Sequence, residues 1–536
     1  MTTRRILALT LLSACGAALR PFPRSEPMRA DADMVPFAPK PTKYKSPEIW
    51  NTVDNTLFEP LVKVLAVDRV PRALNVNAFD EVPDSSWFTN RIDTLVRDPD
   101  AFVRGPCTAP TPDAAGPWTV IGGKPNGANP GFMVKHASGQ TFLFKLDGGT
   151  QGERASTADV IGSRIYYAAG YNAPCNRIAY IDPATFVLSP KAKAENFVGD
   201  EIPFTQQMLE AALAKGIRSP EGRIRGGLSQ LLDGKPLGPW KDWGTRADDP
   251  NDVIAHEERR ELRGSYVFGA WLGHYDAREQ NSLDMWIETT GGLGYVKHYM
   301  LDFGDCLGSG SAWARVTSRR GHAYELDWPV AFVEIVTLGL LDRPWRDPQE
   351  STAGPTLGTF TPEVFTADGY RTAYRYGPYT RVTEADGAWG ARILAQISPA
   401  LIRALVADAY LSDPAVATEL ERSLLGRRAK LLRRYLTGLS PLARPHIDDH
   451  GQLCMVDARR DGGLAVSAVQ ARVLSPDGTP ALSVVTDVVA GETCVDVPVP
   501  GGDEVTVVEI QAVGTRPVRV HLYASDAKLR IAGIER

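Results

Sequence analysis

Three polar residues, Asp276, Asn281 and Asp302, have an order and spacing that suit phosphoryl-transfer chemistry. Asp276 and Asn281 lie five residues apart in a polar loop after an apolar stretch, and Asp302 ends an apolar strand 21 residues later. Magnesium bound to nucleotide phosphates prefers oxygen ligands and takes only one or two from the protein. We therefore expect Asn281 and Asp302 to bind a metal and Asp276 to orient or deprotonate an attacking hydroxyl. Arg278 is placed to neutralise charge on the transferred group.

These residues also match known motifs. His274-x-Asp276-x-x-x-x-Asn281 resembles the catalytic loop of protein kinases, and Asp302-Phe303-Gly304 resembles their magnesium-binding motif. The alternative for Asp276 and Asn281 is a turn stabilised by side-chain caps, and for Asp302 a strand end with a buried aromatic neighbour. The agreement of both motifs in order favours the kinase interpretation.

A lysine and a glutamate upstream extend the resemblance. Lys145 ends an apolar strand and matches the kinase lysine that holds the nucleotide phosphates, and Glu153 opens the next helix, where it can pair with Lys145. The gap of eight residues is shorter than in ordinary protein kinases and is closer to HipA-like, CotH-like and other atypical kinases. The resemblance covers about residues 115–440 and implies ATP and magnesium as cofactors.

The chain departs from the kinase pattern at the phosphate-covering loop, because no Gly-x-Gly-x-x-Gly lies between the first two predicted strands. The nearest candidate contains Gly122, Gly123 and Lys124. Its glycines allow close backbone approach to a phosphate, and Lys124 is placed to help. A glycine-rich turn that only joins two strands is the equal alternative.

These residues need a sheet and a helical region to position them. Strand patterns at 118–121, 132–135 and 141–146 precede a predicted helix at 153–169, and the chain becomes mainly helical from about residue 253. We expect an α+β fold: a two-lobed protein-kinase-like domain, with a sheet-rich N-lobe and a helical C-lobe, followed by a small all-β sandwich. The expected parts are a signal peptide (1–15), a flexible tether (16–47), an N-terminal extension (48–114), the N-lobe (115–234), the C-lobe (235–444) and the β-sandwich (445–536).

The N-terminus has the pattern of an export signal, with Arg4 and Arg5 before a short apolar stretch. It ends in Leu12-Ser13-Ala14-Cys15, which resembles the lipobox of bacterial lipoproteins and implies lipid attachment at Cys15. The resemblance implies a lipid-anchored protein of the bacterial cell envelope that contacts the membrane through its anchor. An ordinary signal peptide, or a buried helix with a chance cysteine, is the alternative.

The charge and the cysteine pattern of the chain limit the classes of partner and metal site that we expect. A net charge of −5 gives no basic surface for nucleic acid. The cysteines form no Cys-x-x-Cys pair, so a zinc site is not expected. In an exported protein some cysteines pair, and Cys454 with Cys494 is the bridge we favour, because both lie in the C-terminal part.

The resulting hypothesis is an ATP- and magnesium-dependent phosphotransferase whose acceptor (protein, sugar, lipid or small molecule) is open. ATP is scarce outside the cytoplasmic membrane, so the alternative is a non-catalytic, pseudokinase-like binding lipoprotein. Transfer of a nucleotidyl group is a third possibility.

Overall fold

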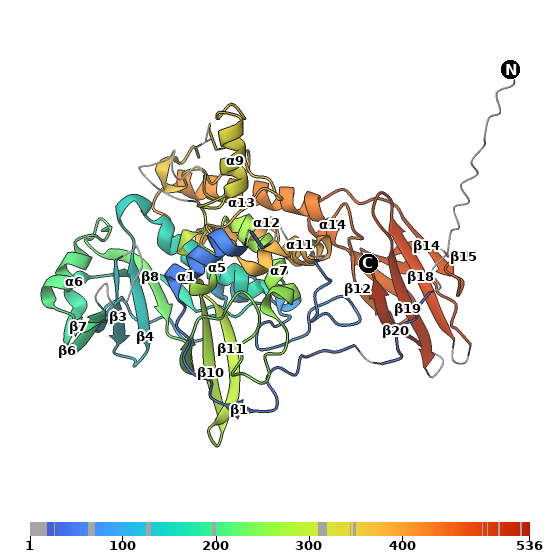
Figure 1. The fold of residues 1–536 in the computed structure, drawn as a ribbon, viewed down its shortest axis with the longest axis horizontal. Coiled ribbons are helices and arrows are strands. Elements are labelled where there is room, and N and C mark those ends of the chain that lie inside the picture. The colour runs from blue at the N-terminus through green and yellow to red at the C-terminus, as the bar shows by residue number, and fades with distance from the viewer. Residues whose placement is uncertain are drawn as a thin grey trace.

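The computed structural model describes residues 19–308 and 319–536, apart from short gaps at 26, 60, 63–69, 125–129, 196–199, 344, 347–349, 485, 490, 502–503 and 526–527. Helices and several sheets make a mixed α+β protein. A seven-stranded sheet lies at one end, the C-terminal strands lie at the other, and most helices lie between them (Figure 1). The predicted signal peptide and Cys15 lie outside the described residues.

The seven-stranded sheet has the order β5-β8-β4-β3-β2-β6-β7. Strands β3 and β4 alternate buried side chains with mostly half-buried ones, as in a sheet with one face more fully covered than the other. The 16-residue helix α5 packs against β5 and β8 and is buried along nearly its whole length. The bounds are β2 Trp118–Gly123, β3 Gly131–His136, β4 Thr141–Leu146, α5 Arg154–Ala169, β5 Asn176–Ile181, β6 Phe186–Glu195, β7 Glu201–Pro203, α6 Gln206–Leu213 and β8 Ile224–Gln230.

A second sheet, of order β1-β11-β10-β9, lies beside the helices. The hairpin of β10 and β11 matters most, because its open end carries the predicted site. Helices α7, α11 and α13 form a core with Trp271 and Trp389 fully buried. The bounds are β1 Ala38–Pro39, β9 Lys235–Gly238, α7 Arg260–Leu272, β10 Ser282–Thr290, β11 Leu293–Met300, α9 Trp328–Val336, α10 Gly377–Thr380, α11 Glu384–Gln396, α12 Pro399–Ala407 and α13 Pro414–Tyr435.

The C-terminal part contains two antiparallel sheets, of order β12-β13-β17-β16 and β15-β14-β18-β19-β20, whose inner side chains form one core. The predicted Cys454–Cys494 disulfide is confirmed and joins the paired strands β13 and β17. The bounds are β12 Leu442–Ile447, β13 Leu453–Asp457, α14 Ala458–Asp461, β14 Val469–Leu474, β15 Pro480–Val484, β16 Thr486–Val489, β17 Glu492–Val495, β18 Val505–Ala512, β19 Val518–Ser525 and β20 Lys528–Glu535.

The segment expected to be a flexible tether makes fixed contacts instead. Asp33 accepts a hydrogen bond from the Ser86 hydroxyl at 2.6 Å. Tyr44 donates to Glu279 Oε1 at 2.8 Å, next to the predicted catalytic loop. Buried polar groups that find partners hold a segment in place despite a Pro- and Lys-rich composition. The N-terminal extension continues with α1 Glu48–Val53, η1 Asp54–Phe58, α3 Ile92–Leu95 and α4 Pro99–Arg104.

Within the part of the chain that the structure describes, no single helix is long and apolar enough to cross a membrane. The pair α11 and α12, bent by 72° at their junction, meets the length and composition requirement together.

Candidate functional site

The β10–β11 hairpin brings the two predicted motifs together. Ser282 opens β10 opposite Met300, the last residue of β11. The backbone N–H of Leu301 then donates to the Asn281 carbonyl at 2.9 Å. Asn281 and Asp302 therefore leave the same end of the hairpin, although 21 residues separate them in the chain.

The loop before Asn281 is shaped by the end of α7. Gly273 follows the helix with φ 64° and ψ 40°, the left-handed conformation that glycine adopts at little cost. The chain then turns away from the helix axis and carries His274 and Asp276 into the site. Asn281 Nδ2 donates to both the Asp276 carbonyl, at 2.7 Å, and Asp276 Oδ2, at 2.9 Å.

Asp276 is a partly buried carboxylate with one cationic neighbour. Its side chain is 23% exposed, and Arg278 Nε lies 2.9 Å from Oδ1. Burial raises the pKa of Asp276 to about 6, against the lowering effect of Arg278. A carboxylate with a pKa near 6 is mostly ionised at neutral pH and can still accept a proton from a hydroxyl.

Lys145 lies between two carboxylates. Its Nζ is 2.9 Å from Asp302 Oδ1 and 3.2 Å from Asp159 Oδ2. Burial alone lowers the pKa of Lys145, but Asp159 and Asp302 raise it overall, so the ammonium stays charged. Partial burial of Asp302 works to raise its pKa, but the charge of Lys145 outweighs it and lowers the pKa overall. Lys145 therefore bridges Asp159, on helix α5, and Asp302.

The predicted Lys145–Glu153 pair is wrong, because Asp159 of α5 holds Lys145. Glu153 precedes the first turn of α5, and its Oε1 lies 3.7 Å from Arg225 Nε. Its Oε2 accepts the backbone N–H of Ser412 at 2.8 Å. Asp159 lies six residues later along the helix and is 2% exposed. Glu153 was expected to pair with Lys145 because it is the nearer acid in the sequence, but the structure pairs Lys145 with Asp159.

Lys124 belongs to the site, but the two glycines before it pack against protein. Burial lowers the pKa of Lys124, and the charge of Lys145 lowers it further. A Cβ on Gly122 would lie 2.8 Å from the Lys193 carbonyl oxygen. One on Gly123 would lie 2.9 Å from Ala194. Both glycines are thus explained by the close approach of β6. The turn after Lys124, with Gly127, lies outside the described residues.

Phe303 locks the Asp302 motif against α5. Its ring stacks on Tyr166 at 5.0 Å between centroids and lies 5.6 Å from the His274 ring. A Cβ on Gly162 would lie 2.4 Å from Phe303 Cβ, so glycine is needed where the aromatic residue meets the helix. The backbone N–H of Phe303 also donates to Asp159 Oδ1 at 3.0 Å. Asp159 therefore positions both Lys145 and the Asp302 motif.

A buried arginine holds the residues after Phe303. Arg154 is 1% exposed and its Nη1 donates to the carbonyls of Gly304, at 3.2 Å, and Cys306, at 2.7 Å. Sequence reasoning missed Arg154 and Asp159. The helical pattern gave no signal for Asp159, because successive helix residues point about 100° apart and Asp159 lies off the face that Ala158, Ile161 and Ile165 share.

The oxygen groups of the site fit a magnesium ion. Asp302 has a half-exposed side chain, and Lys145 donates a hydrogen bond to its Oδ1. The two hydrogen bonds of the Asn281 amide use Nδ2, which leaves its carbonyl oxygen as an acceptor. A carboxylate and an amide oxygen suit a hard cation that keeps several waters and phosphate oxygens as its other ligands.

Comparison with known proteins gives little guidance. No protein-family model and no curated protein matches the chain. A crystal structure of the Golgi casein kinase with Mn/ADP bound is similar at 10% identity and a TM-score of 0.27, over 76% of this chain and 93% of that one. A second Golgi casein kinase structure gives 10% identity and a TM-score of 0.25, over 64% and 75%. Similarity at this level carries no argument about fold or activity.

Proposed function

We propose that the chain is an ATP- and magnesium-dependent phosphotransferase with an atypical kinase-like, two-lobed fold. The observation that carries the proposal is the bridge from Asp159 through Lys145 to Asp302, next to Asp276 and Asn281. A lysine whose side chain is 13% exposed, held by two acids, presents a fixed positive charge beside oxygens that could bind a metal. Phosphoryl transfer needs this combination of positioning and charge, and little else from the protein.

Each residue has a defined task in this proposal. Lys145 holds nucleotide phosphates, and Asp159 keeps the lysine in place. Asp276 accepts the proton of the attacking hydroxyl or orients it, with Arg278 beside it to balance charge. Asn281 and Asp302 would hold magnesium, which when bound neutralises phosphate charge. Lys124 supplies a second cation near Lys145.

The remaining parts of the proposal concern location and partners. We propose that the seven-stranded sheet with α5 is the N-lobe, that the helices from α7 to α13 form the C-lobe, and that the C-terminal sheets are an appended β-sandwich. The basic and apolar N-terminus that ends in Cys15 supports lipid anchoring in a bacterial cell envelope. The acceptor is a protein, a sugar, a lipid or a small molecule.

Calorimetry with a non-hydrolysable ATP analogue tests the proposal. We expect magnesium-dependent binding to the intact chain and its loss in Asp302→Ala. The matched control is Asp449→Ala, which removes an exposed aspartate in a turn of the C-terminal part. Absence of magnesium-dependent binding in the wild type, or equal binding by Asp302→Ala, would refute the proposal.

Incubation with ATP labelled at the γ-phosphate then separates activity from binding. Label in the protein or in an added acceptor supports phosphoryl transfer. Binding without transfer supports the non-catalytic alternative. A product that gains the mass of a nucleotide indicates nucleotidyl transfer.

A further inference from the structure

A cavity of about 880 Å³ lies away from the nucleotide site. Its walls come from α4, the segment after Cys107, the start of β5, α5 and the end of α12. None of its lining residues is Lys145, Asp159 or Asp302. It is therefore a separate cavity, although helix α5 contributes residues both to it and to the site described above.

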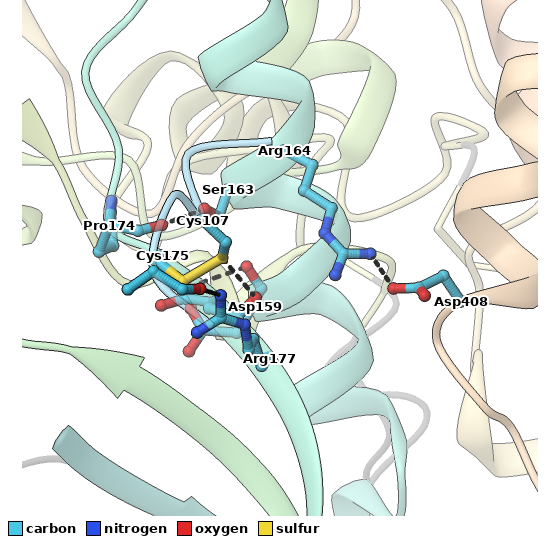
Figure 2. The surroundings of a disulfide bond; sticks show 10 residues. Cys107, Asp159, Ser163, Arg164, Pro174, Cys175, Arg177 and Asp408 are labelled. Carbon is cyan, nitrogen blue, oxygen red and sulfur yellow. Dashed lines mark hydrogen bonds and ion pairs between the residues drawn. A yellow bond between two sulfur atoms is a disulfide. The ribbon is translucent and has the colours of Figure 1, made fainter. Parts of the chain in front are cut away.

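Arg177 is the residue that makes this cavity unusual. Its side chain reaches the cavity from β5, beside the Cys107–Cys175 disulfide (Figure 2). Nη2 donates to the carbonyl of Ala109, whereas Nη1 is buried and has no hydrogen-bond partner among the described residues. Arg177 is only 9% exposed, and no acidic side chain among the described residues forms an ion pair with it. A buried guanidinium without a counter-charge is costly unless an anion compensates it.

A second arginine increases the positive charge. Arg164 extends from α5 to form an ion pair with Asp408 (Figure 2), and its Nε is buried without a hydrogen-bond partner among the described residues. Burial lowers the pKa of Arg177, and the Arg164 charge lowers it further, so the two guanidinium groups repel each other. Exposed Arg104 adds a third cation to the lining, and Asp100 is the remaining acid.

The walls of the cavity are fixed before any ligand arrives. The Cys107–Cys175 disulfide ties the segment after Cys107 to the start of β5. The Ser163 hydroxyl donates to the Pro174 carbonyl, which ties α5 to the same strand. A pocket whose walls are already tied together spends little free energy on ordering them when it binds an oxyanion.

We propose that this cavity binds a small phosphate-bearing anion, held by Arg177 with help from Arg164. Guanidinium groups match the geometry of phosphate oxygens and bind them through paired, charge-assisted hydrogen bonds. Apolar residues complete the lining, including Val103, Ile178 and Ala404. Those residues suit the organic part of a phosphate monoester. Inorganic phosphate and an organic phosphate share the recognised group, and the experiment distinguishes them.

Calorimetric titration of the full chain without nucleotide or magnesium tests the proposal. Inorganic phosphate and phenyl phosphate are the probes, and neutral benzyl alcohol is the uncharged control. We expect both phosphates to bind and benzyl alcohol not to bind. Tighter binding of phenyl phosphate identifies an organic ligand, and equal binding identifies free phosphate.

Three variants locate the binding. Arg177→Gln should weaken phosphate binding at least about tenfold, because one charge-assisted contact is lost. Arg223→Gln, at an exposed position before β8, should leave binding unchanged. Asp408→Asn should strengthen binding, because it removes the carboxylate that competes for Arg164; this variant keeps the test open if Arg177→Gln does not fold. Absence of phosphate binding in the wild type overturns the proposal, as does wild-type affinity in a folded Arg177→Gln or weaker binding in Asp408→Asn.

Discussion

Replacing Asp159 by asparagine tests which acid of α5 organises the nucleotide site. Asparagine keeps an oxygen that can accept the Phe303 N–H but removes the charge that faces Lys145. The matched variant is Glu153→Gln, which changes the other acid at the start of the helix in the same way. If Asp159 is the acid that holds Lys145 in place, only the first variant should disturb nucleotide binding.

The magnitude follows from the geometry. At 3.2 Å and an effective dielectric constant of about 20, two unit charges attract by about 5 kcal/mol before desolvation is counted. Removing one partner of a buried pair costs about 3–5 kcal/mol when the other is left alone. Lys145 keeps Asp302 at 2.9 Å, so we expect a smaller loss of about 2–3 kcal/mol. A loss of that size corresponds to about 30- to 150-fold weaker binding.

Calorimetry with a magnesium–ATP analogue measures this effect, and circular dichroism confirms that each variant is folded. Glu153→Gln should bind within about threefold of the wild type, because it disturbs only a 3.7 Å contact with Arg225 and a hydrogen bond from Ser412. Equal losses in both variants, or a larger loss in Glu153→Gln, would show that our assignment of Asp159 is wrong.

Three further predictions concern other residues. Asp276→Asn should lower the transfer rate about 10²- to 10⁴-fold while nucleotide binding persists, measured by label transfer beside calorimetry. Gly162→Ala should destabilise the chain by about 1–3 kcal/mol in denaturant unfolding, because its Cβ meets Phe303, whereas Gly438→Ala, with open space around it, should not. Burial raises the pKa of Asp242 to about 7, above its unfolded value, so its contribution to stability falls as the pH rises from about 4 to 7. Asp242→Asn should therefore raise the melting temperature at pH 8 and have little effect at pH 4; a gain at both pH values would contradict this explanation.

The sequence alone was sufficient to identify the three polar residues at the open end of the β10–β11 hairpin. Asp276, Asn281 and Asp302 are spaced by local elements, a helix end and one hairpin, so their meeting follows from short-range structure. Lys145 was recognisable because it lies one residue before the end of an alternating strand. The Cys454–Cys494 bridge was predictable for a similar reason, since both cysteines fall in one small unit.

The parts that sequence reasoning missed depend on long-range packing. Choosing between Glu153 and Asp159 requires the rotation of α5 against β4, which sequence distance does not give. The Cys107–Cys175 disulfide joins residues 68 positions apart, with strands β2, β3 and β4 and helix α5 between them. The order in residues 27–46 comes from buried partners such as Ser86 and Glu279, which a local composition cannot reveal.

The Cys107–Cys175 disulfide also has a consequence for when the protein can work. Asn176, the residue after Cys175, donates to the backbone carbonyl of Asp159 at 3.1 Å. The disulfide therefore lies one residue from a contact to Asp159, the acid that holds Lys145. Thiols stay reduced in the cytoplasm and pair outside it. If the chain is exported as proposed, it lacks this bridge while it is still in the cytoplasm, and oxidation after export adds the bridge beside the residue that holds Lys145. Formation of the disulfide would then complete the support of the site outside the cytoplasm.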